Sequence, residues 1–423
     1  MDELRAAGKP FRISKQEVWD AWVKVKGNQG APGVDGQSIE DFGKDLRNNL
    51  YKVWNRMSSG TCFPPPVKAV EIPKPHGGGT RVLGVPCVAD RIAQTVAAAR
   101  LEQAVEPVFH PDSYGYRPQR DALDAVAACR KRCWENSWVI DLDIRKFFDS
   151  VRWDLIVKAV EHHTGHETRW IVLYVKRWLA APLQHPDGTL QERDRGTAQG
   201  SAISPVLANL FMHYAFDLWL SREFPLVSFE RYADDAVIHC AGEYQARKVL
   251  AALHERMAEV GLELHPDKTR IVYCKDARRR GSAEHTSFTF LGFTFRARRA
   301  RRARRADGVQ FAAFLPAISK DALKKISAEV RSWRLHRWVS SGGPEIAKLV
   351  NPKIRGWMAY YGAFYPSALY PVLQRINTYL LRWIMKKYKK HSTWKKATKV
   401  LAGVAANRPR YFAHWAWVKP AAS

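Results

Sequence analysis

Two adjacent aspartates, Asp234 and Asp235, lie between apolar runs at residues 226–229 and 236–238. The pattern predicts a short β-hairpin that carries both carboxylates at its bend. Neighbouring like charges repel, so two carboxylates at a strand tip cost stability unless a cation lies beside them. The alternative is a solvated turn, in which aspartate is common. The two residues alone leave both interpretations open.

A second apolar stretch, residues 138–144, also carries carboxylates. As a strand, its period-two alternation places Val139, Asp141 and Asp143 on one face and the other apolar side chains on the opposite face. Carboxylates at alternate positions of an apolar strand indicate a cation site or partners for buried bases. The alternation does not choose between Asp141 and Asp143.

The charge balance indicates a polyanionic partner. The 423 residues include 68 Lys and Arg against 41 Asp and Glu, which gives a formal net charge of +27. An excess of this size favours nucleic acid, with an anionic membrane surface as the weaker alternative. A hydrophobic content of 46% suits globular cores, and the length suits two or three domains.

Nothing in the sequence indicates a membrane-spanning or secreted protein. The amino terminus lacks the apolar core of a signal peptide. The longest uncharged stretch, residues 196–216, is too polar to span a bilayer. The six cysteines form no CxxC pair, so a reduced intracellular location is expected.

The sequence of the amino-terminal third predicts a helical region followed by a β-hairpin. Residues 14–57 are expected to be mainly helical, with Ser38 as the N-cap of one helix. Residues 67–86 predict a β-hairpin with a glycine-rich loop that Lys74 and Arg81 flank. Two cations beside a flexible loop suit a triphosphate grip, and the alternative is two exposed basic residues.

Further helices and loops follow along the chain. Residues 153–179 predict one long helical region. Residues 196–205 predict a loop of small residues, with Ser204 as the N-cap of the next helix and Pro205 at its first position. An aromatic β segment is expected at residues 288–295.

Two basic regions lie in the second half of the chain. The arginine-rich run Arg296–Arg305 is either a solvated linker between strands or a phosphate-contacting ridge. From Arg382 to Trp417, lysines are interleaved with aromatic residues in a helical context. This mixture suits phosphate contacts with base stacking, and the aromatic residues equally suit a core.

The order of these motifs resembles that of group II intron-encoded reverse transcriptases, which also act as maturases. The resemblance runs from Asn28 to Trp417. Its most specific parts are the Tyr-Ala-Asp-Asp box at residues 232–235, the Asp-Leu-Asp-Ile strand at 141–144 and the loop at 199–205. Further matching segments are residues 72–74, 81–86, 113–118, 147–149, 266–269 and 290–293.

The resemblance implies an α+β fold of the right-hand polymerase type. Its fingers and its palm, an antiparallel sheet packed on helices, would be followed by an α-helical thumb. The implied domains are residues 1–130 for an N-terminal extension and the fingers, 131–312 for the palm, 313–385 for the helical thumb or maturase domain, and 386–423 for a basic aromatic tail that binds nucleic acid.

Carried onto this sequence, the resemblance implies that Asp143, Asp234 and Asp235 hold two Mg²⁺ ions, with Mn²⁺ as a substitute. It favours Asp143 over Asp141, because Phe148 then stands where the family keeps an aromatic steric gate against ribose. Two such ions stabilise the attacking and leaving oxygens of an in-line displacement, and hard oxygen ligands suit Mg²⁺.

The same resemblance implies further site residues. Lys268 matches a lysine that is a candidate general acid for the pyrophosphate leaving group. The implied dNTP-binding residues are Lys74, Arg81, Phe148, Gln199 and Gly200, and the implied primer grip is Leu291 with Gly292.

The implied enzyme is an RNA-directed DNA polymerase that adds dNTPs to a primer 3′ end on an RNA template. As a maturase it would also bind a group II intron RNA and assist splicing and retrohoming. Its partners would be the RNA template, the intron RNA and a DNA primer or target, in a bacterial-type cytoplasm or at the nucleoid, without a membrane. No zinc-dependent HNH endonuclease is expected before Ser423.

Two other functions stay open at this point. One is a domesticated reverse transcriptase that serves phage defence or repair. The other is a non-catalytic RNA-splicing factor that keeps only the fold, against which the intact Asp143, Asp234 and Asp235 argue. The sequence leaves open which intron is bound, whether maturase activity is retained and whether the protein is a monomer or a dimer.

Overall fold

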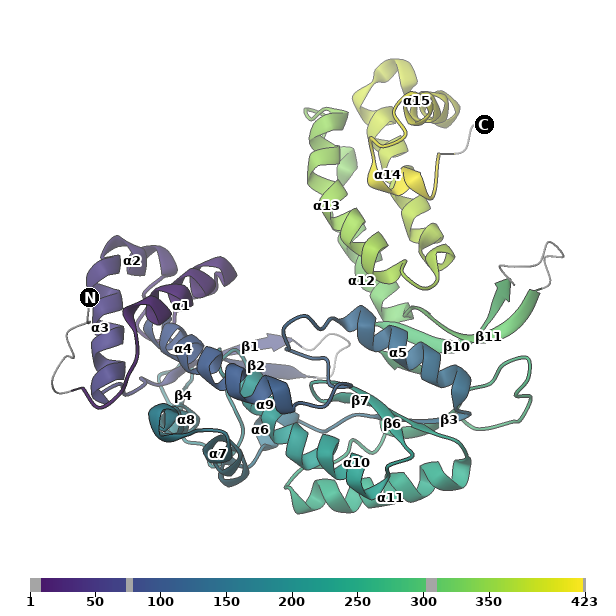
Figure 1. Cartoon of the computed structure of the whole chain (residues 1–423). Helices are drawn as coiled ribbons and strands as arrows, with labels where there is room; N and C mark the ends of the chain where they lie inside the picture. The colour runs from purple at the N-terminus through teal and green to yellow at the C-terminus, as the bar shows by residue number, and fades with distance from the viewer. Residues whose placement is uncertain (1–8, 74–78, 302–309, 421–423) are drawn as a thin grey trace, which may run out of the picture. The chain divides into compact units, whose positions relative to one another are not determined.

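A computed structural model describes residues 9–73, 79–301 and 310–420 of the chain (Figure 1). Lys74 and residues 302–305 of the arginine-rich run lie outside the described residues. The chain divides into two compact units. Unit 1 comprises residues 1–121, 142–238 and 247–269, and unit 2 comprises residues 122–141, 239–246 and 270–423.

The amino-terminal helices of unit 1 follow the predicted pattern. They are α1 (Lys15–Asn28), α2 (Ile39–Lys44), α3 (Leu46–Ser59) and α4 (Val88–Val105). The side chain of Ser38 accepts a hydrogen bond from the backbone N–H of Asp41, so the predicted N-cap of α2 is confirmed. A capping box of Ser14 and Glu17 begins α1 in the same way.

The predicted hairpin at residues 67–86 is confirmed. Strands β1 (Val67–Pro73) and β2 (Thr80–Val85) pair antiparallel, with Val70 opposite Leu83. They belong to a four-stranded sheet of order β2-β1-β4-β5, which the short strands β4 (Leu183–Gln184) and β5 (Leu190–Gln191) complete.

The long helical region predicted at residues 153–179 is in fact two helices. They are α7 (Trp153–His162) and α8 (Trp170–Ala180). The Thr164 hydroxyl donates to the carbonyl of Val160, and the backbone N–H of Gly165 donates to the Thr168 hydroxyl. These side-chain bonds to the backbone compete with the helical ladder and end α7 at this point.

The predicted acidic hairpin and acidic strand both lie in one sheet. Its order is β6 (Ser228–Tyr232), β7 (Asp235–Cys240), β3 (Trp138–Leu142) and β8 (Arg270–Tyr273). Further helices before residue 270 are α5 (Ala122–Glu135), α6 (Phe147–Ser150), α9 (Ser204–Met212), a π-helical turn (His213–Asp217), α10 (Leu218–Glu223) and α11 (Glu243–Glu259).

The strand predicted at residues 138–144 is shorter than expected. Strand β3 ends at Leu142, so Asp143 lies beyond the strand rather than on its face. Both faces of β3 are covered, because Val139 and Ile140 are both fully buried. Asp141 is also buried, and the Nε of Arg270 on the paired strand β8 donates to its carboxylate at 3.3 Å.

Unit 2 combines a small sheet with helices. The sheet has the order β11-β10-β9, from strands β9 (Phe288–Phe290), β10 (Phe293–Arg301) and β11 (Gln310–Ile318). The helices are α12 (Lys320–Ser332), α13 (Gly343–Tyr361), α14 (Tyr370–Lys387) and α15 (Trp394–Asn407). The aromatic β segment predicted at 288–295 forms two strands that turn back on each other at Leu291 and Gly292, whose φ angles are +50° and +80°.

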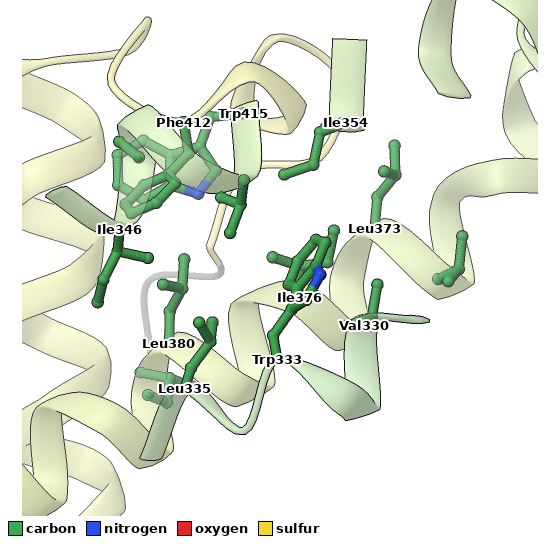
Figure 2. Packing of buried hydrophobic residues seen from close by; sticks show 14 of the residues in the cluster. Val330, Trp333, Leu335, Ile346, Ile354, Leu373, Ile376, Leu380, Phe412 and Trp415 are labelled. Atoms are coloured by element: carbon green, nitrogen blue, oxygen red, sulfur yellow. The ribbon is translucent and has the colours of Figure 1, made fainter. Parts of the chain in front are cut away.

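One hydrophobic cluster joins these helices to the end of the chain. Figure 2 shows Trp333, Leu373 and Ile376 packed in the same cluster as Phe412 and Trp415. Trp415 is fully buried, whereas Trp394 is 49% exposed. The aromatic residues of this region were expected either to stack on bases or to form a core. Phe412 and Trp415 belong to the core, whereas the exposed ring of Trp394 is available for other contacts.

Two predictions about the environment of the chain can be compared with the structure. In the part of the chain that the structure describes, no helix is both long enough and apolar enough to cross a bilayer. All six cysteines lie in the described residues; none forms a disulfide, and all except Cys62 are buried.

Candidate active site

The turn between β6 and β7 presents the adjacent aspartates, as predicted. Strand β6 ends at Tyr232 and β7 begins at Asp235, so Ala233 and Asp234 form the bend. Ala233 is buried and has a left-handed φ of +59°, which is uncommon for a residue with a side chain. We call residues 233–235 the aspartate turn.

Asp143 is fixed by a loop that follows much later in the chain. The backbone N–H of His265 donates to the carbonyl of Asp143 at 2.8 Å, and the Thr269 hydroxyl donates to the same carbonyl at 3.2 Å. The Lys268 ammonium lies 3.1 Å from Oδ2 of Asp143. The loop therefore holds both the backbone and the carboxylate of Asp143.

Both acidic segments face one cavity of about 800 Å³ within unit 1. Its lining includes six of the predicted site residues: Arg81, Asp143, Phe148, Gln199, Asp234 and Lys268. Of the described site residues in unit 1, Asp235 and Gly200 do not belong to the lining. These six residues come from five separate segments of the chain, which the fold brings to one cavity.

The electrostatics of the cavity favour a bound cation. Burial raises the pKa of the Asp234 carboxyl, and the nearby charge of Asp143 raises this pKa further. Arg81 and Lys268 act in the opposite direction. A divalent cation beside these carboxylates would offset both burial and repulsion. The donors are carboxylate oxygens, which fit Mg²⁺ or Mn²⁺ better than a soft metal.

Phe148 lies in the short helix α6, whose start is set by an unusual backbone conformation. Lys146 has φ +47° immediately before this helix. Phe147 is buried and packs edge-on against the half-buried Phe148, with ring centroids 5.2 Å apart. The backbone N–H of Thr197 donates to the Phe148 carbonyl at 2.7 Å, which ties α6 to the loop at residues 196–205.

That loop is held by contacts the sequence did not reveal. The backbone N–H of Gly84 donates to the Gln199 carbonyl at 2.8 Å. Gly200 has φ +117°, and a Cβ there would lie 2.7 Å from the Gly84 carbonyl oxygen, so the position requires glycine. The buried Oε1 of Gln94 accepts from the Ser201 hydroxyl at 2.7 Å and from the Ala202 N–H at 2.9 Å.

The predicted start of helix α9 is corrected by one position. The N-cap is Ile203 rather than Ser204, and no side-chain bond caps the helix. The Ser204 hydroxyl instead donates to the carbonyl of Ala198 at 3.0 Å. Ser204 therefore stabilises the loop, while Pro205 still lies in the first turn of the helix.

Leu291 and Gly292, the predicted primer grip, lie in unit 2. The Tyr360 hydroxyl donates to the Leu291 carbonyl at 2.9 Å, and the Ser319 N–H donates to the Gly292 carbonyl at 2.9 Å. A Cβ at Gly292 would lie 3.3 Å from the Tyr361 ring. The turn is thus anchored to the helices of its own unit. Lys74, the remaining predicted residue, is outside the described residues.

Comparison with known proteins identifies the class of this fold and site. Residues 72–295, more than half of the chain, match the family described as "Reverse transcriptase (RNA-dependent DNA polymerase)". Residues 323–401 match a second family, "Group II intron, maturase-specific domain". The chain therefore belongs to the reverse transcriptase family, and it is an RNA-directed DNA polymerase with a group II intron maturase domain. The predicted resemblance and α+β fold class are confirmed.

Individual relatives agree with this assignment. Protein YkfC of Escherichia coli K12 is 29% identical over 335 residues, which cover 68% of this chain and 83% of that protein. Group II intron-encoded protein LtrA of Lactococcus lactis is 26% identical over 59% of this chain and 42% of its own length. The putative COX1/OXI3 intron 1 protein of Saccharomyces cerevisiae is 29% identical over 47% of this chain and 23% of its own length.

The chain thus spans most of YkfC but less than half of LtrA and of the yeast intron protein. Among solved structures, telomerase from Candida albicans in complex with a telomeric RNA fragment aligns with 90% of this chain and 68% of its own. That alignment has 10% identity and a TM-score of 0.48.

Proposed function

We propose that the cavity in unit 1 is the site where dNTPs are added to a primer 3′ end on an RNA template. The observation that carries the proposal is that Asp143 and Asp234, from separate elements, line the same cavity beside Arg81 and Lys268. Reverse transcriptases use divalent metal ions, and the carboxylate donors here fit such ions.

Asp143, Asp234 and Asp235 would hold two Mg²⁺ ions, for which Mn²⁺ would substitute. Bound there, the ions supply charge stabilisation for the attacking and leaving oxygens of an in-line displacement. Asp143 and Asp234 face the cavity directly. Asp235 is the last residue of the aspartate turn and the first of β7, and its part in ion binding rests on the family resemblance.

The basic residues of the cavity suit the triphosphate of the incoming nucleotide. Arg81 lies on the exposed hairpin strand β2, where its guanidinium is accessible to solvent. We propose that Arg81 and Lys74 bind the triphosphate oxygens. Lys268, whose side chain is 59% exposed, would donate a proton to the pyrophosphate leaving group.

Two further elements would select and support the nucleotide. Phe148 lines the cavity from α6, where its ring would clash with a ribose 2′-hydroxyl and so select deoxynucleotides. Gln199 and Gly200, on the loop held by Gln94 and Gly84, would support the templating base pair. Leu291 and Gly292 would contact the primer.

We propose that the helical part of unit 2 binds a group II intron RNA and assists its splicing and retrohoming. Exposed lysines on α14, α15 and the segment between them support an RNA-binding surface: Lys386, Lys389, Lys390, Lys395, Lys396 and Lys399. The domain boundaries after residues 130, 312 and 385 remain part of this proposal. We also propose a cytoplasmic or nucleoid location, where template, intron and target nucleic acids meet.

The experiment that tests the proposal is primer extension with Mg²⁺ on an RNA template, run beside a splicing assay on the intron that flanks the gene. Extension together with accelerated splicing is expected. Splicing without extension would favour the non-catalytic splicing factor. Extension without any effect on an intron, or the absence of intron RNA domains around the gene, would favour a domesticated reverse transcriptase.

A further inference from the structure

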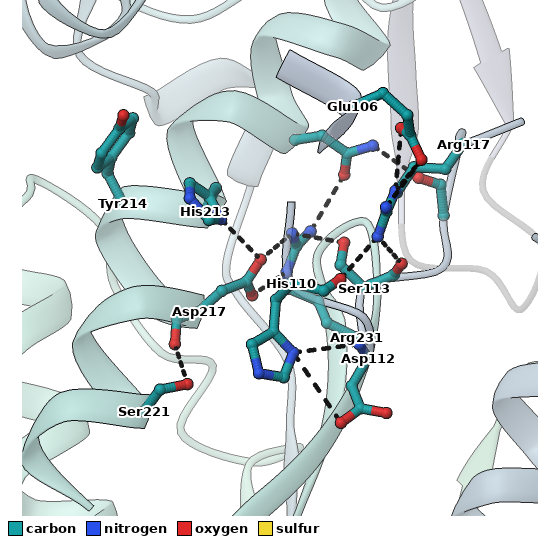
Figure 3. A network of polar contacts seen from close by, with 12 residues as sticks. Glu106, His110, Asp112, Ser113, Arg117, His213, Tyr214, Asp217, Ser221 and Arg231 are labelled. Atoms are coloured by element: carbon teal, nitrogen blue, oxygen red, sulfur yellow. Dashed lines mark hydrogen bonds and ion pairs between the residues drawn. The ribbon is translucent and has the colours of Figure 1, made fainter. Parts of the chain in front are cut away.

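Arg231, which precedes the aspartate turn by two residues, is fully buried and makes an unusually complete set of contacts (Figure 3). Its guanidinium donates five hydrogen bonds. Two of them, at 2.7 and 2.6 Å, reach the two carboxylate oxygens of Asp217, which is also fully buried. The pair is therefore a desolvated, bidentate ion pair.

The other three bonds connect separate segments of the chain. Nη1 donates to the side-chain oxygen of Asn209 on α9 at 3.1 Å and to the backbone carbonyl of Ala233 at 2.9 Å. Nη2 donates to the hydroxyl of Ser113 at 2.8 Å. Asn209 in turn donates to the Gly115 carbonyl at 2.6 Å. One guanidinium thus links α9, the π-helical turn and the loop at residues 113–118 to the aspartate turn.

Ala233 is the position where the aspartate turn needs support. Its φ of +59° is a conformation that residues with a side chain adopt at an energetic cost. The Arg231 guanidinium donates to its carbonyl. Gly115 packs closely against its nitrogen, since a Cβ on Gly115 would be 2.5 Å from that atom. The residue before Asp234 is therefore held at both its nitrogen and its carbonyl oxygen.

Another basic group next to Asp217 does not share the role of Arg231. His213 Nδ1 lies 3.9 Å from the Asp217 carboxylate, as Figure 3 also shows. Burial lowers the pKa of His213 to about 4, so this histidine is neutral near pH 7. The charge of Asp217 is consequently balanced by Arg231, which fixes the guanidinium plane and the direction of its remaining donors.

We infer that Arg231 is a positioning residue that sets the geometry of the aspartate turn, with Asp217 and Asn209 orienting it and Gly115 packed against the Ala233 nitrogen. The inference rests on the proposed function of the turn. A buried ion pair contributes little net stability compared with apolar packing, so its specific effect here is geometric. The residue acts through the Ala233 carbonyl and does not touch substrate.

The test compares Arg231→Lys with Asp217→Asn, which both disrupt the buried ion pair. Only Arg231→Lys removes the guanidinium group that donates to the Ala233 carbonyl, because lysine has a single ammonium in its place. In single-nucleotide extension at saturating Mg²⁺, Arg231→Lys is expected to lower the maximal rate about 100-fold, since a displacement near 1 Å can cost that much. Asp217→Asn keeps one side-chain oxygen that can still accept from the guanidinium and orient it toward the Ala233 carbonyl. This variant is expected to lower the melting temperature as much as Arg231→Lys does, with a much smaller rate loss.

A second measurement does not depend on catalysis. Hydrogen exchange of the peptide that spans residues 229–240 should be faster in Arg231→Lys than in Asp217→Asn. Gly115→Ala should also lower the rate and speed exchange there, because the added Cβ would press on the Ala233 nitrogen while leaving both partners of the ion pair in place. In both rate-impaired variants the apparent dNTP affinity should change less than about threefold, because the nucleotide contacts remain.

Each alternative outcome is decisive. Equal rate losses in Arg231→Lys and Asp217→Asn that follow their loss of stability would reduce Arg231 to a structural role. Wild-type extension by Arg231→Lys would overturn the inference outright. If the wild-type protein extends no primer, the proposed function fails instead. In that case the exchange measurement still decides whether Arg231 orders the turn.

Discussion

The ammonium nitrogen of Lys268 lies 3.1 Å from Oδ2 of Asp143, and both side chains face the candidate active-site cavity. The side chains are 59% and 41% exposed, so the pair itself contributes little to stability. Its importance is positional. The contact places a lysine that is a proposed acid beside a carboxylate that is a proposed metal ligand.

This arrangement predicts that Lys268 acts by proton transfer as well as by charge. Lys268→Ala is expected to slow single-nucleotide incorporation about 100-fold, the usual size of a general-acid contribution. Lys268→Arg keeps the positive charge beside Asp143 but does not release a proton near neutral pH. It should therefore lose nearly as much rate in rapid-quench kinetics. A Lys268→Arg enzyme with the wild-type rate would show that charge alone is required.

The position of Phe148 predicts how the sugar is selected. Phe148→Ala opens space where a 2′-hydroxyl would lie, so discrimination against ribonucleotides should fall by roughly 10–100-fold. The ratio of kcat/KM for a dNTP and the matching rNTP measures this directly. Because Phe147 beneath it stays packed, the dNTP rate should change little. An unchanged ratio would move the gate to another residue.

His414 predicts a pH dependence of stability in unit 2. It is fully buried, and its Nε2 donates to the Asn377 side-chain oxygen at 2.7 Å, because that oxygen also accepts from Trp415. Its Nδ1 is buried without a hydrogen-bond partner, and burial lowers the pKa of His414 to about 3. A proton on Nδ1 would therefore be a buried charge, so the folded protein keeps this histidine neutral.

The direction in which stability changes with pH follows from the difference in proton binding between the folded and the unfolded chain. Between the usual histidine pKa, about 6.5, and pH 3 the unfolded chain binds a proton at this site that the folded protein does not. Stability should thus fall as the pH drops below about 6.5, by about 2 kcal/mol at pH 5 from this group alone. His414→Gln keeps a donor for Asn377 and does not titrate. The urea midpoint by tryptophan fluorescence should shift less between pH 7 and 5 in this variant than in the parent.

The exposed lysines around α15 predict a salt-dependent RNA affinity. Each lysine that contacts a phosphate adds about 0.7–0.9 to the slope of log affinity against log salt concentration. Replacing three of them with glutamine should reduce that slope by about 2 to 3. The three lysines to replace are Lys389, Lys390 and Lys395. A control variant with the same change in charge carries glutamine in place of Lys24, Lys26 and Lys52 on the amino-terminal helices. Equal slopes in the two variants would mean that the surface around α15 does not bind phosphates preferentially.

The sequence predicted those structural elements whose formation depends on residues close together in the chain. The Ser38 cap, the β1–β2 hairpin and the aspartate turn all depend on residues within a few positions of one another. The break between α7 and α8 was missed because helical spacing continues on both sides of Thr164 and Gly165. Strand β3 was predicted to include Asp143 because its end at Leu142 is set by strand pairing rather than by its own residues.

The supporting residues of the site could not be predicted in this way. Gln94 and Ser201 are 107 positions apart, and Arg231 and Ser113 are 118 apart, so their contacts exist only in the folded chain. In the sequence, Gln94 is one polar residue in an alanine-rich helix, and Arg231 is one more cation in a strongly basic protein. The motif resemblance named six of the residues that line the cavity, and the structure adds the residues that hold them.

The central claim is that Asp143 and Asp234 together form the metal-dependent centre of the polymerase. The most direct test is Mg²⁺-dependent primer extension on an RNA template by Asp143→Asn and Asp234→Asn, with Asp141→Asn as the matched control. Asp141 pairs with Arg270 and is not among the residues that line the cavity. Asp143→Asn and Asp234→Asn should bind RNA normally and extend no primer, while Asp141→Asn extends it. Full extension by Asp143→Asn or Asp234→Asn would contradict the claim.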